Sequence, residues 1–276
     1  MSERGKSSNT LALLYGSRQN APASSGYAVL RLSGFCTGFS ADDVARLFAR
    51  NSGVEIDAAF SAPLFTNRIH FPIDCQTGYA PKECFVEFPT FTDALAALDF
   101  SAETIIDGRC VICRWSSQIE LRDALFPSIR KESADRENTK YASSVLGKRG
   151  TTVFLERKDI NGMILLCKEA KTRFPGSSII KPFRAVVSIL CKVPWNLAHS
   201  LSPIHRDHIF EMFKLSFEAA QCLSQEKDSL LPSSIVEQMV RCALCVPGFT
   251  EKQKHAILAL TVTTYFYMHQ NSSHNY

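Results

Sequence analysis

The spacing of hydrophobic residues changes once along this chain, and this change limits the possible folds more than any other sequence feature. Between Tyr27 and Trp115, short runs with two-residue alternation are interleaved with runs of helical spacing. From Thr152 onward, every periodic segment has helical spacing. A chain of 276 residues is long enough for two domains of ordinary size. We therefore expect an α+β domain over residues 27–128 and an all-α domain over residues 152–270.

The first region contains four strand-like and two helix-like runs. The strand-like runs are AVLRLSGF (28–35), NRIHFPI (67–73), ECFVEF (83–88) and RCVICRW (109–115). Ser40 and the two aspartates that follow Ala41 mark the start of one helix, and apolar residues on one face of 91–98 form the other. The order strand, helix, strand, strand, helix, strand predicts a ferredoxin-like βαββαβ fold. In that fold two helices cover one face of a four-stranded antiparallel sheet and leave the other face open.

The second region contains five segments with an apolar stripe at helical spacing. Ser202 followed by Pro203 is a helix-start signal, and both Ser234–Glu237 and Thr250–Gln253 fit the capping-box pattern. Five helices with short connections predict an α-helical bundle. Trp195 either anchors a partner or packs in the seam of the bundle itself. The residues of this region resemble no family that we can name.

Charge is distributed unevenly along the chain. The formal net charge is +4, but residues 27–128 hold 8 Lys and Arg against 13 Asp and Glu. Residues 129–151 hold 6 basic against 3 acidic side chains and lack apolar periodicity, which predicts a basic linker. Residues 1–26 are rich in small polar residues and predict a disordered tail. Positive charge therefore lies mainly outside the first domain.

Several classes of protein lack support in the sequence. No apolar run is long enough to span a bilayer, and the N-terminus does not have the pattern of a secretory signal, so we expect an intracellular, non-membrane protein. The ten cysteines fit a reducing compartment. The spacing Cys110–Cys113 falls on a strand, where residues three apart point to opposite faces, and Cys242–Cys245 has no evident further ligands. With no catalytic motif present, we expect no enzyme activity, metal, cofactor or small-molecule substrate.

The runs AVLRLSGF, SADDV, RIHFPIDCQTGYAPKECFVEF and IIDGRCVICRW resemble an RNA recognition motif (RRM). More specifically, they resemble the quasi-RRM of heterogeneous nuclear ribonucleoproteins F and H. Residues 33–36 correspond to the Arg-Gly-Leu-Pro segment of that group, and residues 82–87 correspond to its Gly-Glu-Ala-Phe-Val-Glu segment. The resemblance implies binding of single-stranded RNA, a role in mRNA processing or regulation, and nuclear residence with or without shuttling to the cytoplasm.

The resemblance and the strand alternation together define candidate RNA-binding residues. Along 83–88, Cys84, Val86 and Phe88 should face the helices, whereas Glu83, Phe85 and Glu87 should face the open side. Phe85 is then either a platform for a base or a residue covered by the linker or the helical domain. The candidate RNA-binding residues are Arg31, Phe35, Tyr79, Lys82, Phe85, Arg109 and Arg114.

Two hypotheses of function follow from these observations. The first is a non-enzymatic protein that binds single-stranded RNA and uses its helical domain for contacts with a protein partner. The second is a protein-interaction module whose degenerate RRM has lost RNA binding. The acidic charge of residues 27–128 and the scarcity of stacking aromatics favour the second.

Overall fold

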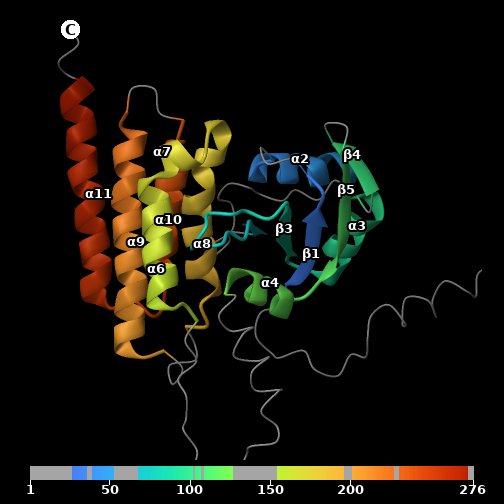
Figure 1. Ribbon diagram of the computed structural model, residues 1–276, viewed down its shortest axis with the longest axis horizontal. Coiled ribbons are helices and arrows are strands. Elements are labelled where there is room, and N and C mark those ends of the chain that lie inside the picture. Colours follow the sequence, from blue (N-terminus) through green and yellow to red (C-terminus); the bar gives the residue numbers. More distant parts are fainter. Residues whose placement is uncertain are drawn as a thin grey trace, which may run out of the picture.

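The computed structural model describes residues 27–35, 39–52, 68–101, 103–106, 109–126, 154–195, 201–226 and 230–272. Within these ranges the chain forms an antiparallel sheet with helices, followed by a bundle of helices (Figure 1). The predicted change from mixed structure to helices is confirmed. The predicted tail (1–26) and basic linker (129–151) lie outside the described residues.

The sheet has five strands in the order β2-β3-β1-β5-β4, and every neighbouring pair is antiparallel. The strands are β1 (Ala28–Ser33), β2 (Ile69–His70), β3 (Glu83–Phe88), β4 (Glu103–Ile106) and β5 (Arg109–Ser116). Four of them correspond to predicted strands, although β2 is much shorter than the predicted 67–73. Strand β4 was not predicted, and it extends the sheet beyond β5.

One face of the sheet, here called the inner face, is covered by α2 (Ala41–Ser52) and α3 (Phe91–Ser101). Helix α2 begins as predicted: the Ser40 hydroxyl accepts a hydrogen bond from the Asp43 N–H at 3.2 Å, and the Asp43 carboxylate accepts one from the Ser40 N–H at 2.8 Å. The inner-face residues of β3 are Cys84, Val86 and Phe88, which are buried against these helices as their alternation predicted.

All five predicted helices of the second region are present. They are α6 (Arg157–Lys168), α8 (Lys181–Lys192), α9 (Pro203–Ser224), α10 (Ser233–Cys245) and α11 (Glu251–Ser272). The short helix α7 (Ala170–Arg173) and the 3-10 turn η1 (Gly176–Ile180) were not predicted. No helix in the described ranges is both long and apolar enough to cross a bilayer.

The predicted helix starts of this region are confirmed in two of three cases. The Ser202 hydroxyl accepts a hydrogen bond from the His205 N–H at 3.1 Å. Thr250 and Gln253 form a reciprocal capping box, with bonds of 2.9 and 3.2 Å. The box expected at Ser234 is wrong, because the residue that precedes α10 is Pro232, two positions earlier, and no side chain caps the helix.

Trp195 packs in the seam of the bundle. Its indole lies 5.5 Å from the ring of Phe249, centroid to centroid, and its Nε1–H donates to the Leu190 carbonyl at 2.8 Å. The second of the two alternatives for this residue is therefore the correct one.

Helix α4 (Gln118–Leu125) was not predicted, and it changes the character of the opposite face of the sheet, here called the outer face. The Ser117 hydroxyl caps this helix by accepting from the Glu120 N–H at 3.1 Å. Helix α4 lies between the sheet and the bundle (Figure 1) and contacts both β1 and α8. The outer face is therefore not open over its whole width.

The outer face and the bundle share one hydrophobic core. Val29 and Phe85 of the sheet belong to the same buried cluster as Leu121 of α4 and as Val187 and Leu190 of α8. A second contact joins the loop after β2 to α6, where a Cβ on Gly162 would lie only 2.1 Å from the Cys75 carbonyl oxygen. Only glycine permits so close an approach, so α6 and this loop are fitted to each other.

Candidate nucleic-acid interface

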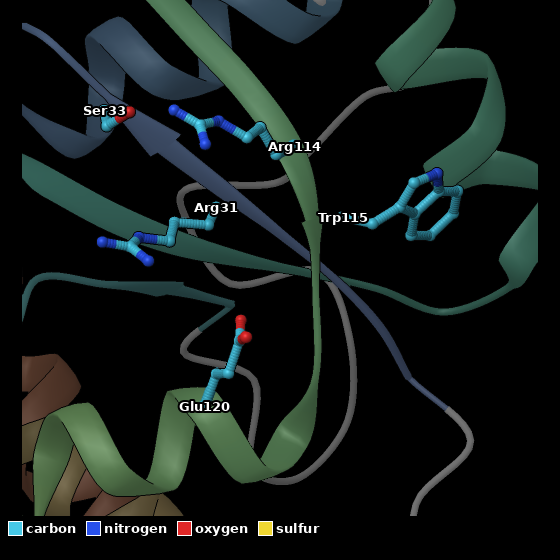
Figure 2. Close-up of a pocket in the computed structure, with 5 residues that line it drawn as sticks. All are labelled: Arg31, Ser33, Arg114, Trp115 and Glu120. Atoms are coloured by element: carbon cyan, nitrogen blue, oxygen red, sulfur yellow. The ribbon is translucent and has the colours of Figure 1, made fainter. Parts of the chain in front are cut away.

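The uncovered part of the outer face contains a shallow hollow of about 210 Å³ (Figure 2). It is lined by Arg31, Ser33, Arg114, Trp115 and Glu120. Arg31 of β1 and Arg114 of β5 are direct cross-strand partners, and their side chains extend to the same side of the sheet. The structure thus brings together two of the predicted RNA-binding residues.

The two arginines differ in their electrostatic surroundings. Arg31 donates from Nε to the Glu83 carboxylate at 3.0 Å, and its guanidinium carbon lies 5.9 Å from the centroid of the Phe85 ring. Arg114 is exposed and makes no hydrogen bond or ion pair with any residue that the structure describes. An anion entering the hollow would therefore meet one arginine without an acidic partner and one arginine already paired.

Glu120 is the carboxylate among the residues that line the hollow, whereas Glu83 pairs with Arg31 beside it. Glu120 accepts a hydrogen bond from the Ser116 hydroxyl at 2.5 Å and lies in the first turn of α4, where negative charge is favourable. Two arginines therefore face two carboxylates, Glu83 and Glu120. This near balance of charge predicts weak binding of a polyanion, which salt weakens further.

Lys82 and Arg109 lie together at one end of the sheet, beyond Ser33. The Gly34 N–H donates to the Lys82 carbonyl at 3.1 Å, and a Cβ on Gly34 would lie 2.5 Å from the Cys110 carbonyl oxygen. Gly34 has φ of 95°, a conformation that glycine adopts without strain. This turn brings the start of β3 next to the start of β5. Both Lys82 and Arg109 are exposed.

Two predicted contact residues are buried, which corrects the prediction for them. Phe85 is only 2% exposed, because α4 and the bundle cover its side of the outer face. Phe35 is 4% exposed and stacks on Phe39 with a centroid distance of 4.7 Å. Neither ring can stack on a base in this structure. For Phe85 the alternative of a covered residue is therefore the correct one.

Tyr79 is exposed, but it belongs to the loop that packs on α6. The Asp74 N–H donates to the Tyr79 carbonyl at 2.8 Å, closing the loop. Gln76 of the same loop donates to the Asp159 carboxylate of α6 at 2.9 Å. Tyr79 is thus fixed by the contact with the helical region, and it does not line the hollow that contains Arg31.

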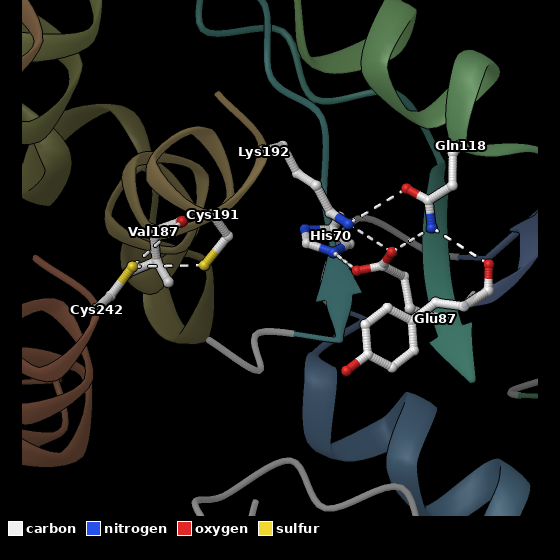
Figure 3. Close-up of polar contacts among 8 residues, drawn as sticks. His70, Glu87, Gln118, Val187, Cys191, Lys192 and Cys242 are labelled. Carbon is white, nitrogen blue, oxygen red and sulfur yellow. Dashed lines mark hydrogen bonds and ion pairs between the residues drawn. The ribbon is translucent and has the colours of Figure 1, made fainter. Parts of the chain in front are cut away.

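The covered half of the outer face contains a buried polar network (Figure 3). Glu87 is at its centre and is 5% exposed. Its carboxylate accepts hydrogen bonds from His70 Nε2 at 3.0 Å, from Lys192 Nζ at 2.5 Å and from the Gln118 amide at 2.5 Å. These groups come from β2, from α8 and from α4, so the network ties the sheet to both elements that cover it.

The network keeps Glu87 ionised at neutral pH. Burial alone would raise the pKa of Glu87, but the hydrogen bond from His70, the charge of Lys192 and the bond from Gln118 lower it to about 2. Burial lowers the pKa of His70, which opposes the effect of Glu87. Because a carboxylate only accepts hydrogen bonds, we assign the His70 proton to Nε2.

The sequence could not have identified this network. Alternation placed Glu87 on the outer face, but Lys192 follows it by 105 residues. Sequence spacing carries no information about such a distant pair. The Ser117–Glu120 cap of α4 was the one local signal that an additional helix follows β5.

The cysteine pairs show no arrangement for a metal. Cys113 is buried in the inner core and Cys110 is exposed, as expected for residues three apart on β5. Throughout the described ranges, no group of three or more His, Cys, Asp or Glu side chains could hold a metal ion.

Comparison with known proteins places only the helical region. Residues 152–263, about two fifths of the chain, match a family described as a domain of unknown function (DUF8399). No curated protein and no solved structure matches the chain.

Proposed function

We propose that residues 27–128 form a ferredoxin-like RRM and that this protein is a non-enzymatic, single-stranded RNA-binding protein acting in the nucleus in mRNA processing or regulation. The strand order β2-β3-β1-β5, with α2 and α3 on one face, supports the fold assignment. The observation that carries the RNA assignment is the side-by-side placement of Arg31 and Arg114 on the uncovered half of the outer face.

The ligand contact is with phosphates. Affinity for nucleic acid rests largely on Lys and Arg that neutralise the backbone, and the exposed cations of the sheet are Arg31, Arg114, Lys82 and Arg109. Base stacking, the usual second source of affinity on such a sheet, has no platform here because Phe85 is buried. Binding therefore depends on salt and shows little preference among RNA sequences.

The decisive experiment is a titration of the full chain with pools of single-stranded RNA at two salt concentrations. Arg114→Ala should weaken binding and reduce the dependence of log K on log salt by roughly 0.7. Glu83→Gln should strengthen binding, because it releases Arg31 from its ion pair. Arg241→Ala, which removes an exposed cation from α10, is the matched control and should leave binding unchanged.

A protein-interaction module is the second candidate, and the burial of Phe85 specifically favours it. A sheet whose aromatic is part of a shared core has lost the surface on which an RRM stacks bases. In this case the helical region, alone or with the sheet, contacts a protein partner. Absence of RNA binding at low salt, with Glu83→Gln equally inactive, would support this candidate over the first.

A further inference from the structure

Two cysteine side chains meet where α8 packs on α10. The Sγ atoms of Cys191 and Cys242 are 3.4 Å apart, and the Cys242 thiol also contacts the Val187 carbonyl at 3.8 Å (Figure 3). Cys191 lies in the last turn of α8, and Cys242 lies on the buried side of α10. The two sulfur atoms are in van der Waals contact and point toward each other.

The two thiols differ in how solvent reaches them. Cys242 is buried at 7% exposure, whereas Cys191 is half-buried, so a small oxidant reaches Cys191 first. The hydrogen bond with Cys191, together with burial, raises the pKa of Cys242 well above its usual range. Cys242 thus stays a protonated thiol, held beside Cys191. By contrast, Cys84 and Cys167 are fully buried in hydrophobic cores, out of reach of an oxidant.

We propose that Cys191 and Cys242 form a reversible disulfide when the protein reacts with hydrogen peroxide. In the first step the sulfur of Cys191 attacks a peroxide oxygen. An S–O bond forms, the O–O bond breaks, and the leaving hydroxide takes up the Cys191 thiol proton, so that a sulfenic acid and one water result. In the second step the sulfur of Cys242 attacks the sulfur of Cys191. The S–S bond forms, the S–O bond breaks, and hydroxide leaves with the thiol proton as a second water. The two thiols lose two electrons, and hydrogen peroxide gains them.

The bond would join residues 51 apart in sequence and fix α8 to α10. It would also restrain the end of α8 next to Lys192, the residue that holds Glu87 of the sheet. Figure 3 shows the thiol pair and the Glu87 network on either side of this end of α8. Oxidation should therefore raise the urea midpoint of the full chain, and dithiothreitol should return it to its original value.

The test is peroxide titration of the full chain, followed by N-ethylmaleimide under denaturing conditions and peptide mapping. We expect a cross-linked peptide that joins Cys191 to Cys242, about 2 Da lighter than the two reduced peptides together and cleaved by dithiothreitol. Cys242→Ser should instead leave a sulfenic acid on Cys191 that dimedone traps. Cys222→Ser, which removes an exposed cysteine of α9, is the control and should keep the cross-link.

Peptide mapping of the peroxide-treated chain without substitutions tests the proposal even if a serine variant does not fold. Recovery of both Cys191 and Cys242 as N-ethylmaleimide adducts, after peroxide has oxidised other thiols, would overturn the proposal. A cross-link from Cys242 to Cys245 in place of Cys191 would overturn it as well. Loss of the 191–242 cross-link in Cys222→Ser would show that the bond forms by exchange through another thiol, and would also contradict direct formation.

Discussion

One row of residues crosses four strands on the outer face of the sheet, and its side chains change from buried at one end to exposed at the other. His70, Phe85, Arg31 and Arg114 are successive cross-strand partners. His70 and Phe85 are 0% and 2% exposed, whereas the side chain of Arg31 is 46% exposed and Arg114 is also exposed. At the level of this row, the β2–β3 side of the outer face is thus an internal interface, and the β1–β5 side is a surface. Two residues before Arg31, Val29 of β1 is still part of the covered core.

This difference in burial predicts that the covered half contributes to stability and the open half to binding. In the covered half the side chains pack on α4 and the bundle, so changes there should alter stability. In the open half the side chains face solvent, so changes there should alter binding and leave stability nearly unchanged. A substitution in the open half that lowers stability, or one in the covered half that leaves stability unchanged, would contradict this distinction.

The largest effect is expected for Phe85→Ala. Removing a fully buried ring from the shared core should lower the free energy of unfolding by about 4 kcal/mol, measured by urea denaturation. Phe91→Ala is the matched control, because Phe91 is 51% exposed and stacks on Trp115 at 4.8 Å; it should cost about 1 kcal/mol. Equal effects of the two variants would mean that the bundle does not cover Phe85 in solution.

Lys192→Met should have the next largest effect. The methionine keeps the apolar stem but leaves the buried Glu87 carboxylate without its cation, which should cost about 3 kcal/mol in unfolding free energy. Lys171→Met breaks the exposed pair with Glu226 and should cost less than about 1 kcal/mol. If the two lysines prove equivalent, the Glu87 network is not buried between the sheet and the bundle.

Acid should loosen the covered half through Glu87. Its pKa is about 2 in the folded chain and 4.5 ordinarily, so its contribution to stability is present above pH 4.5 and is lost as pH falls toward 2. Between pH 7 and pH 3 this amounts to about 2 kcal/mol. His70 lowers the stability further as pH falls below 6.5, the ordinary pKa of histidine. Below this pH the histidine takes up a proton in the unfolded chain, whereas burial lowers its pKa in the folded chain.

The measurement is the urea midpoint as a function of pH for the natural chain and for Glu87→Gln. The variant should be less stable at pH 7 but should lose less stability between pH 4.5 and pH 3. Parallel curves for the two proteins would exclude Glu87 as the source of the acid sensitivity.

The smallest effect on stability is expected in the open half. Arg114→Ala should change the free energy of unfolding by less than about 0.5 kcal/mol, because the side chain is exposed and pairs with no described residue. The same variant should weaken RNA binding in the titration described above. A stability loss comparable to that of Lys192→Met would place Arg114 in an interface, and the two halves would then not differ.

Much of the fold could be predicted because its signals are local. The caps at Ser40, Ser202 and Thr250 involve residues three positions apart, and each formed as expected. The alternation of β3 correctly divided Cys84 and Val86 from Phe85, because strand geometry alone sets it. Of the candidate site, the four cations are exposed as expected, whereas Phe35 is buried against expectation, and for Phe85 the alternative of a covered residue is the correct one.

The sequence by itself determined the order of the elements, their faces and the change from a mixed to a helical region, since each depends on neighbours within a few positions. Only the tertiary structure decided that half of the outer face is covered. That outcome depends on α4 and on α8, and the pairing of Glu87 with Lys192 spans 105 residues. Whether the second face of the sheet is buried depends on the free energy of packing it against elements that are distant in the sequence, so no short pattern in β3 could have specified it.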